Sequence, residues 1–148
     1  MSPIADNGQK LSFSDISLNQ LHPGMVTSAV IERLSPAAWA YLGDAVYELY
    51  VRTLYLAPPK KMQTYHKLVV GQVRAETQAR HLRSIAPYLN STELAIVKRG
   101  RNAAASRSQR ADPEIYQQAS SLETLVGYLY LTDPERLTIL MALLEIES

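Results

Sequence analysis

Two carboxylates, Asp44 and Glu123, stand in apolar surroundings on widely separated segments of this chain. Asp44 follows a glycine within Trp39–Glu48, and Glu123 lies in a segment rich in leucine and valine. A charge in such surroundings costs free energy unless a partner compensates it. Because Mg²⁺ takes oxygen ligands and commonly uses only one or two protein carboxylates, this pair could together hold a divalent cation.

Other partners for the two carboxylates are open at this point. Gly43-Asp44 could mark a helix break with Asp44 as the cap of the next helix, and an arginine could satisfy Glu123. Glu48 lies one helical turn beyond Asp44, where it could add an outer contact to a metal or pair with a cation. The residues alone do not decide between a metal site and these structural roles.

Basic residues concentrate in two parts of the chain, although the formal net charge is only +1. Lys60, Lys67 and Arg74 recur every seven residues near Gly71, so they would share one face of a helix. The stretch 94–111 contains no acidic residue and holds Lys98, Arg99, Arg101, Arg107 and Arg110. Such surfaces suit contact with phosphates, and a merely solvated surface is the alternative.

Helix signals place these residues on an all-α framework in a single domain, since no segment alternates like a strand. A cap residue followed by proline predicts helix starts at Ser35-Pro36, Asp112-Pro113 and Asp133-Pro134. We expect long helices over residues 36–56, 61–85, 113–131 and from 134 onward. A shorter one would be capped by Thr92 and ended by Gly100. Residues 1–30 are predicted to be a flexible arm and residues 31–148 the folded domain.

Composition narrows the class of protein. The 148 residues are 47% hydrophobic and 20% charged, as in soluble globular proteins, and include no cysteine. No signal peptide or membrane-length apolar run is recognisable, so we expect a protein that acts inside the cell. The histidines, His22, His66 and His81, lack metal-binding spacing and no Gly-rich phosphate loop occurs, which disfavours zinc, triad and P-loop enzymes.

Several motifs resemble the ribonuclease III family. Residues 41–48, reading Tyr-Leu-Gly-Asp-Ala-Val-Tyr-Glu, are similar to its signature helix. Residues 119–131 are similar to its second motif, in which a glutamate precedes a glycine by four residues. Three further stretches, 66–67, 73–79 and 97–103, resemble the family's Mini-ribonuclease III branch, which has no separate double-stranded-RNA-binding domain. The resemblance runs from about residue 34 to residue 144.

This resemblance implies a Mg²⁺-dependent endonuclease that cleaves double-stranded RNA and leaves 5′-phosphate and 3′-hydroxyl ends. Asp44 and Glu123 would be its catalytic, metal-binding residues. RNA would bind to the basic residues Lys67, Arg74, Lys98, Arg99, Arg101, Arg107 and Arg110. A homodimer is implied, with Trp39 and Tyr41 as candidate interface residues, for which a plain core role is an equal alternative. The implied substrate is a 23S ribosomal RNA precursor in the bacterial cytoplasm, with a ribosomal protein as a further candidate partner.

Two departures from the larger enzymes stand out. Those enzymes carry acids four residues before the signature aspartate and three before the second glutamate, where this chain has Ala40 and Ser120. The short branch is similar in lacking both acids. Each missing carboxylate removes a negative charge, so we expect weaker metal binding in the free protein. The loss also keeps a non-enzyme alternative open, a catalytically silent helical RNA-binding or ribosome-associated protein.

Overall fold

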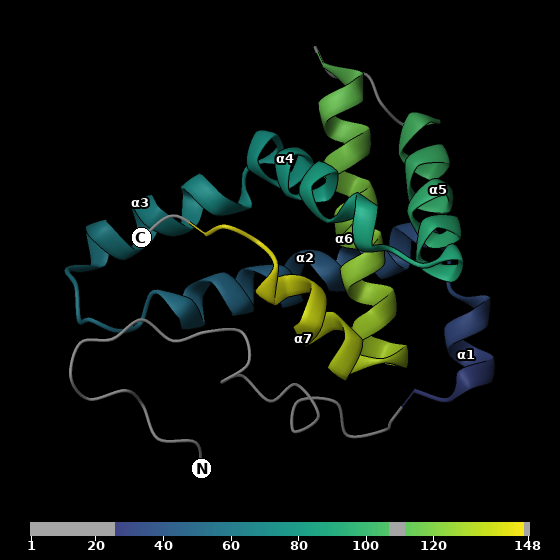
Figure 1. Ribbon diagram of the computed structural model, residues 1–148, viewed down its shortest axis with the longest axis horizontal. Helices are drawn as coiled ribbons and strands as arrows, with labels where there is room; N and C mark the ends of the chain where they lie inside the picture. The colour runs from purple at the N-terminus through teal and green to yellow at the C-terminus, as the bar shows by residue number, and fades with distance from the viewer. Residues whose placement is uncertain (1–25, 107–111, 147–148) are drawn as a thin grey trace.

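A computed structural model describes residues 26–106 and 112–146, which form a set of packed helices (Figure 1). In chain order these are α1 (Ser28–Arg33), α2 (Pro36–Leu54), α3 (Met62–Val73), α4 (Ala75–Ile85), the 3₁₀ helix η3 (Ala86–Tyr88), α5 (Ser91–Ala105), α6 (Pro113–Thr132) and α7 (Pro134–Ala142). The described residues contain no strand, which confirms the predicted all-α class. None of their helices is long and apolar enough to cross a membrane. Of the predicted arm, only residues 26–30 are described, and they already lead into α1.

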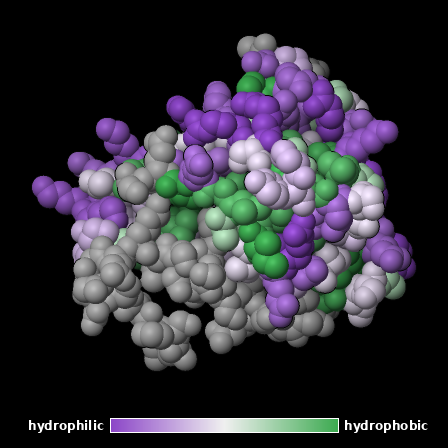
Figure 2. All heavy atoms as spheres, viewed as in Figure 1, coloured by the Kyte–Doolittle hydropathy of each residue, from purple (hydrophilic) through white to green (hydrophobic). Residues whose placement is uncertain are grey.

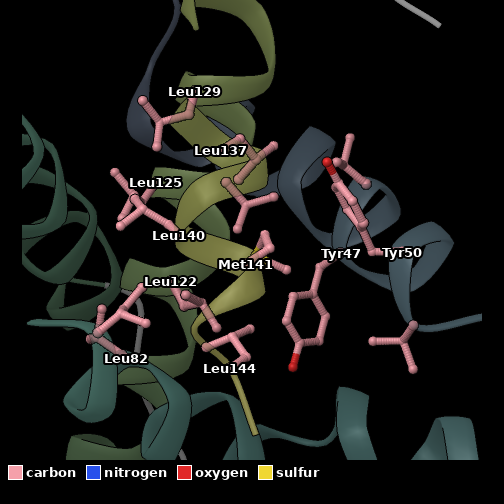
Figure 3. Packing of buried hydrophobic residues seen from close by; sticks show 14 of the residues in the cluster. Tyr47, Tyr50, Leu82, Leu122, Leu125, Leu129, Leu137, Leu140, Met141 and Leu144 are labelled. Atoms are coloured by element: carbon pink, nitrogen blue, oxygen red, sulfur yellow. The ribbon is translucent and has the colours of Figure 1, made fainter. Parts of the chain in front are cut away.

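Helix α6 occupies the centre, and α2, α4, α5 and α7 all pack against it. Figure 3 shows side chains of four helices and of the segment after α7 meeting in the core, among them Tyr47, Tyr50, Leu82, Leu122, Leu125, Leu129, Leu137, Leu140, Met141 and Leu144. A helix surrounded in this way must be apolar on most sides. Glu123 is therefore an ionisable residue on the helix at the centre of the fold.

The predicted helix starts are confirmed where a cap precedes a proline. The side-chain oxygens of Ser35, Asp112 and Asp133 each accept a hydrogen bond from the backbone N–H three residues later, at 3.1, 3.3 and 3.1 Å. These bonds satisfy donors that the first helical turn leaves free. Because each such signal lies within four consecutive residues, it is legible without knowledge of the tertiary structure.

The single helix predicted over residues 61–85 is wrong, because the chain breaks at Arg74 into α3 and α4. Arg74 has an extended ψ of 154°. The Thr77 hydroxyl donates to the Gly71 carbonyl at 2.6 Å, taking an acceptor that a continuous helix would offer to the N–H four residues later. The predicted basic stripe, in which Lys60, Lys67 and Arg74 would share one helix face, is also incomplete. Lys60 lies before the start of α3, and its Nζ donates to the carbonyls of Tyr55 and Pro58.

The short helix predicted to end at Gly100 is wrong at both ends. It starts at an Asn90 cap, where Asn90 and Glu93 form a reciprocal capping box, and it continues to Ala105. Gly100 lies inside this helix, where its lack of a side chain allows α5 to approach α6 closely. A methyl group at this position would press against the side chain of Thr124 on α6. Much of the basic stretch 94–111 thus belongs to helix α5, whereas Arg107 and Arg110 lie outside the described residues.

Candidate active site

Helices α2 and α6 cross with their backbones in direct contact at Gly43 and Gly127. A methyl group on Gly43 would overlap the carbonyl oxygen of Glu123, and one on Gly127 would overlap that of Trp39. Only glycine permits this approach, because it has no Cβ. The crossing brings the residue after Gly43 beside the residue four before Gly127, which are Asp44 and Glu123.

Asp44 and Glu123 lie within hydrogen-bonding reach of each other. Burial, and then the hydrogen bond and negative charge of Asp44, raise the pKa of Glu123 from 4.5 to about 8. Two adjacent carboxylates repel when both are ionised, so the pair retains a proton near neutral pH. Asp44 is exposed, which leaves the pair open to solvent on one side.

The structural alternatives for these carboxylates do not hold. Asp44 lies in the interior of α2, so it is not a helix cap. Among the described ion pairs, none joins an arginine to Glu123. Glu48 pairs with a cation, as the alternative for this residue predicted: its Oε2 lies 2.7 Å from Nη2 of Arg52.

The paired oxygens fit a hard divalent cation. Positive charge between the two carboxylates would replace their repulsion with attraction and displace the shared proton. Within residues 26–106 and 112–146, no group of three or more potential metal-ligating side chains gathers. One or two protein carboxylates are sufficient for Mg²⁺, which keeps several waters and uses substrate phosphate oxygens as further ligands. Ala40 and Ser120 place no further acid one turn before either carboxylate.

Gln78 is a member of this site that sequence reasoning missed. It comes from α4, its side chain is only 2% exposed, and its amide lies close enough to Glu123 to oppose the rise of that pKa. Its Nε2 is buried and makes no well-aligned hydrogen bond to the described residues. A glutamine on an amphipathic helix usually faces water, so the sequence carried no signal that distinguished this one.

Tyr47 and His81 fix α4 against α2 beside the carboxylates. The Tyr47 hydroxyl donates to the Gln72 carbonyl at 3.0 Å and lies 2.8 Å from His81 Nδ1. Burial raises the pKa of Tyr47, so its hydroxyl remains protonated. His81 lies one turn beyond Gln78 on the same helix. The contact with Tyr47 therefore fixes the position of α4 along α2, and with it the position of the Gln78 amide beside the carboxylates.

The basic residues predicted to bind RNA fall into separate places. Lys67 and Arg74 line a groove of about 760 Å³ along α3 and α4, to which α4 adds Arg80, a residue that sequence reasoning missed. On α5, Lys98 is exposed, the Arg99 guanidinium lies 4.8 Å from the centre of the Trp39 ring, and Arg101 pairs with Glu114. The sequence had grouped the α5 residues together, but the structure distinguishes them by their partners.

The two candidate interface residues differ in exposure. Trp39 is only 1% exposed and meets Tyr128 edge to face at 5.2 Å, so it takes the core role. Tyr41 is 85% exposed on the outer face of α2, where a second molecule could cover it. An interface role for Tyr41 stays a prediction.

Comparison with known proteins gives consistent matches over most of the chain. The family described as "Ribonuclease III domain" matches residues 37–134. A Mini-ribonuclease 3 from Synechocystis sp. is 53% identical over 90% of this chain and 94% of the relative. Another Mini-ribonuclease 3, from Thermosynechococcus vestitus, is 46% identical over 87% of this chain and 85% of the relative. A crystal structure of a protein from Fusobacterium nucleatum superposes with a TM-score of 0.67 at 29% identity, covering 73% of this chain and 89% of that one.

Proposed function

Because the chain belongs to the ribonuclease III family and is an endoribonuclease, we propose that it cleaves double-stranded RNA with Mg²⁺ held by Asp44 and Glu123. The observation that carries this proposal is the carboxylate pair at the Gly43–Gly127 crossing, where burial and mutual repulsion raise the pKa of Glu123 to about 8. Perturbed carboxylates of this kind mark sites built for a cation or for proton transfer.

When bound, Mg²⁺ supplies Lewis-acid chemistry, activating water and offsetting charge on the scissile phosphate. The chain's own residues prepare for that event. Asp44, which is accessible from solvent, and Glu123 would hold the cation, and Glu123 would be deprotonated in that state, with the Gln78 amide beside it. Hydrolysis with water attacking phosphorus breaks the bond to the 3′ oxygen, which takes a proton. The products carry a 5′-phosphate and a 3′-hydroxyl end.

Because Ala40 and Ser120 are not acidic, the protein would provide only two carboxylates as ligands for the metal. With only two carboxylates, the free protein should bind Mg²⁺ weakly, and an RNA phosphate would complete the set of oxygen ligands. Metal binding and RNA binding would then reinforce each other, because each supplies charge that the other lacks.

A homodimer would let two such sites cut the two strands of a duplex. The outer face of α2 and its continuation expose Tyr41, Leu49 and Leu56, at 85%, 42% and 50%. Leu49 lies about midway between the other two, so antiparallel packing of two copies about Leu49 would bring Tyr41 against the partner copy near Leu56. There a hollow of about 280 Å³ is lined in part by Met62 and Tyr65. Two-fold pairing is the commonest arrangement of soluble homo-oligomers.

The proposed substrate is a 23S ribosomal RNA precursor in the bacterial cytoplasm, as expected for this branch of the family, with a ribosomal protein as an accessory partner. The duplex would be held by the groove with Lys67 and Arg74 and by the basic side chains of α5. Recognition of RNA duplexes rests mainly on shape, phosphates and 2′-hydroxyls, which such surfaces suit.

Cleavage of matched duplex and single-stranded RNA with Mg²⁺ tests the proposal. We expect cleavage of the duplex only, and equal rates on both substrates would instead indicate a nuclease without duplex preference. Asp44→Asn should retain duplex binding and lose cleavage. If the wild-type protein binds the duplex but never cuts it, the catalytically silent alternative is correct.

A further inference from the structure

The arginines of α5 differ in their access to a phosphate. The Arg99 guanidinium lies over the Trp39 ring, and none of the described ion pairs involves Arg99. Arg101 is bound through both arms of its guanidinium: Nη1 donates to Glu114 Oε1 at 3.0 Å and Nη2 donates to Oε2 at 2.7 Å. Arg101 can therefore use this face for a phosphate only after Glu114 leaves it.

The Arg101–Glu114 contact has the geometry in which arginine holds a phosphate. Two parallel N–H···O bonds join a planar guanidinium to two oxygens of one anion, and a phosphate group offers the same pair of acceptors. Both side chains are accessible, at 43% for Arg101 and 54% for Glu114, so an incoming anion can reach the arginine and a displaced carboxylate can return to water.

Glu114 also holds a second arginine through an intermediary. The Gln118 Nε2 donates to Glu114 Oε1 at 2.9 Å, and Arg83 Nη1 donates to Gln118 Oε1 at 2.5 Å. One carboxylate thus connects cations of α4 and α5 across the first turns of α6. Hydrophilic residues gather over this end of the molecule in Figure 2, near the upper ends of α5 and α6 in Figure 1.

The register of α5 on α6 presents Arg101 to Glu114. Gly100 packs against Thr124 so closely that a methyl group could not be added, and this contact limits sliding of the two helices. The Arg101 backbone is therefore held in place, while its exposed side chain can exchange partners. Arg101 also lowers the pKa of Glu114, so the carboxylate is ionised at neutral pH and competes as an anion.

We propose that Glu114 is a positioning residue that occupies Arg101 in place of an RNA phosphate and is displaced when the duplex binds. This inference rests on the proposed function, since it requires that RNA lie against α5. In the free protein, Glu114 keeps the arginine fork extended and aligned. It also reduces affinity for anions in general, because a ligand must displace a carboxylate that already has good geometry.

Glu114→Gln tests this inference, since glutamine keeps the shape but not the charge. Binding of a short RNA duplex is measured in EDTA as a function of salt, and cleavage is then measured with Mg²⁺. In the wild-type protein the displaced Glu114 regains a counterion when Arg101 meets the phosphate, which offsets the counterion that the phosphate releases. Without the Glu114 charge, the slope of log K against log salt should steepen by about 0.9, which corresponds to about fivefold tighter binding at ~0.15 M salt. For Glu114→Gln we expect this roughly fivefold tighter duplex binding at each protomer's site, a fall in KM of the same size and an unchanged kcat.

Two further variants separate this exchange from a simple change in net charge. In an Arg101→Ala background, Glu114→Gln should give no gain, because the arginine that would bind the phosphate is absent. Glu135→Gln, at the first turn of α7, removes an exposed acid in an equivalent helix position and should leave the slope unchanged. An equal gain in either variant, or weaker binding by Glu114→Gln, would overturn the inference. Absence of duplex binding by the wild-type protein would instead refute the proposed function.

Discussion

Replacing Glu123 by glutamine should stabilise the protein at alkaline pH while abolishing cleavage. Without metal, the folded protein holds a proton on Glu123 up to a pKa of about 8, whereas the unfolded chain releases it near 4.5. Between these values the folded state binds more protons, so its stability falls as pH rises from 4.5 to about 8. Glutamine cannot ionise, and the variant escapes this loss.

The structure sets the magnitude of the effect. A tenfold change in proton affinity is worth about 1.4 kcal/mol, so a rise from 4.5 to about 8 would cost the fully ionised protein at most about 5 kcal/mol. Because the Asp44 side of the pair is open to water, screening should reduce the observed cost to about 2 to 4 kcal/mol. This is a large share of the stability of a typical domain.

Urea unfolding in EDTA at pH 5 and pH 9 measures this cost in wild type and in Glu123→Gln. Between pH 5 and pH 9, the free energy of unfolding should fall by about 2 to 4 kcal/mol more in wild type than in the variant. With Mg²⁺ in place of EDTA, part of this fall should be restored in wild type and none in the variant. Glu135→Gln serves as the control, since it removes an exposed carboxylate and should follow the wild-type profile. Parallel profiles for wild type and Glu123→Gln would refute the assignment of a strained carboxylate pair.

Three other perturbations test the geometry of the site and of the dimer. Gly43→Ala should destabilise the protein by about 3 kcal/mol or more in urea unfolding and abolish cleavage, because its methyl group overlaps the α6 backbone. Gly71→Ala is the control: it adds a methyl group to open space and should stabilise the protein by up to about 1 kcal/mol. Gln78→Leu should fold but bind Mg²⁺ several-fold more weakly in titration calorimetry, and unchanged affinity would remove Gln78 from the site. Leu49→Glu should shift the protein to monomers in sedimentation, with duplex cleavage reduced to single-strand nicks, and an intact dimer would exclude the α2 face.

Local signals explain the parts of the fold that were predictable. The cap and proline at Ser35, Asp112 and Asp133 act through bonds to the N–H three residues later, so their effect does not depend on the rest of the chain. The two long helices that carry Asp44 and Glu123, expected over residues 36–56 and 113–131, are observed as α2 and α6. The presence of both carboxylates in apolar surroundings was visible in the sequence, and the family motifs gave them a role.

Side-chain contacts that residue propensity does not describe, one local and one between helices, explain the two main errors. The break at Arg74 is accompanied by a Thr77 hydroxyl bond to the Gly71 carbonyl, and the continuation of α5 through Gly100 reflects a close approach to Thr124. Gly100 looked like a helix end because glycine is favoured there, yet the absence of a side chain instead served helix packing. Propensity describes a residue in isolation, and packing overrode it.

The sequence by itself determined the all-helical class, the main helix starts and the two acids available for chemistry. Only the tertiary structure decided that glycines on two helices bring Asp44 and Glu123 together, that Gln78 joins them, and that Arg101 is held by Glu114. The physical reason is range. Capping and periodicity act over a few residues, whereas the pKa of a buried carboxylate and the partner of an arginine depend on groups that only folding brings near.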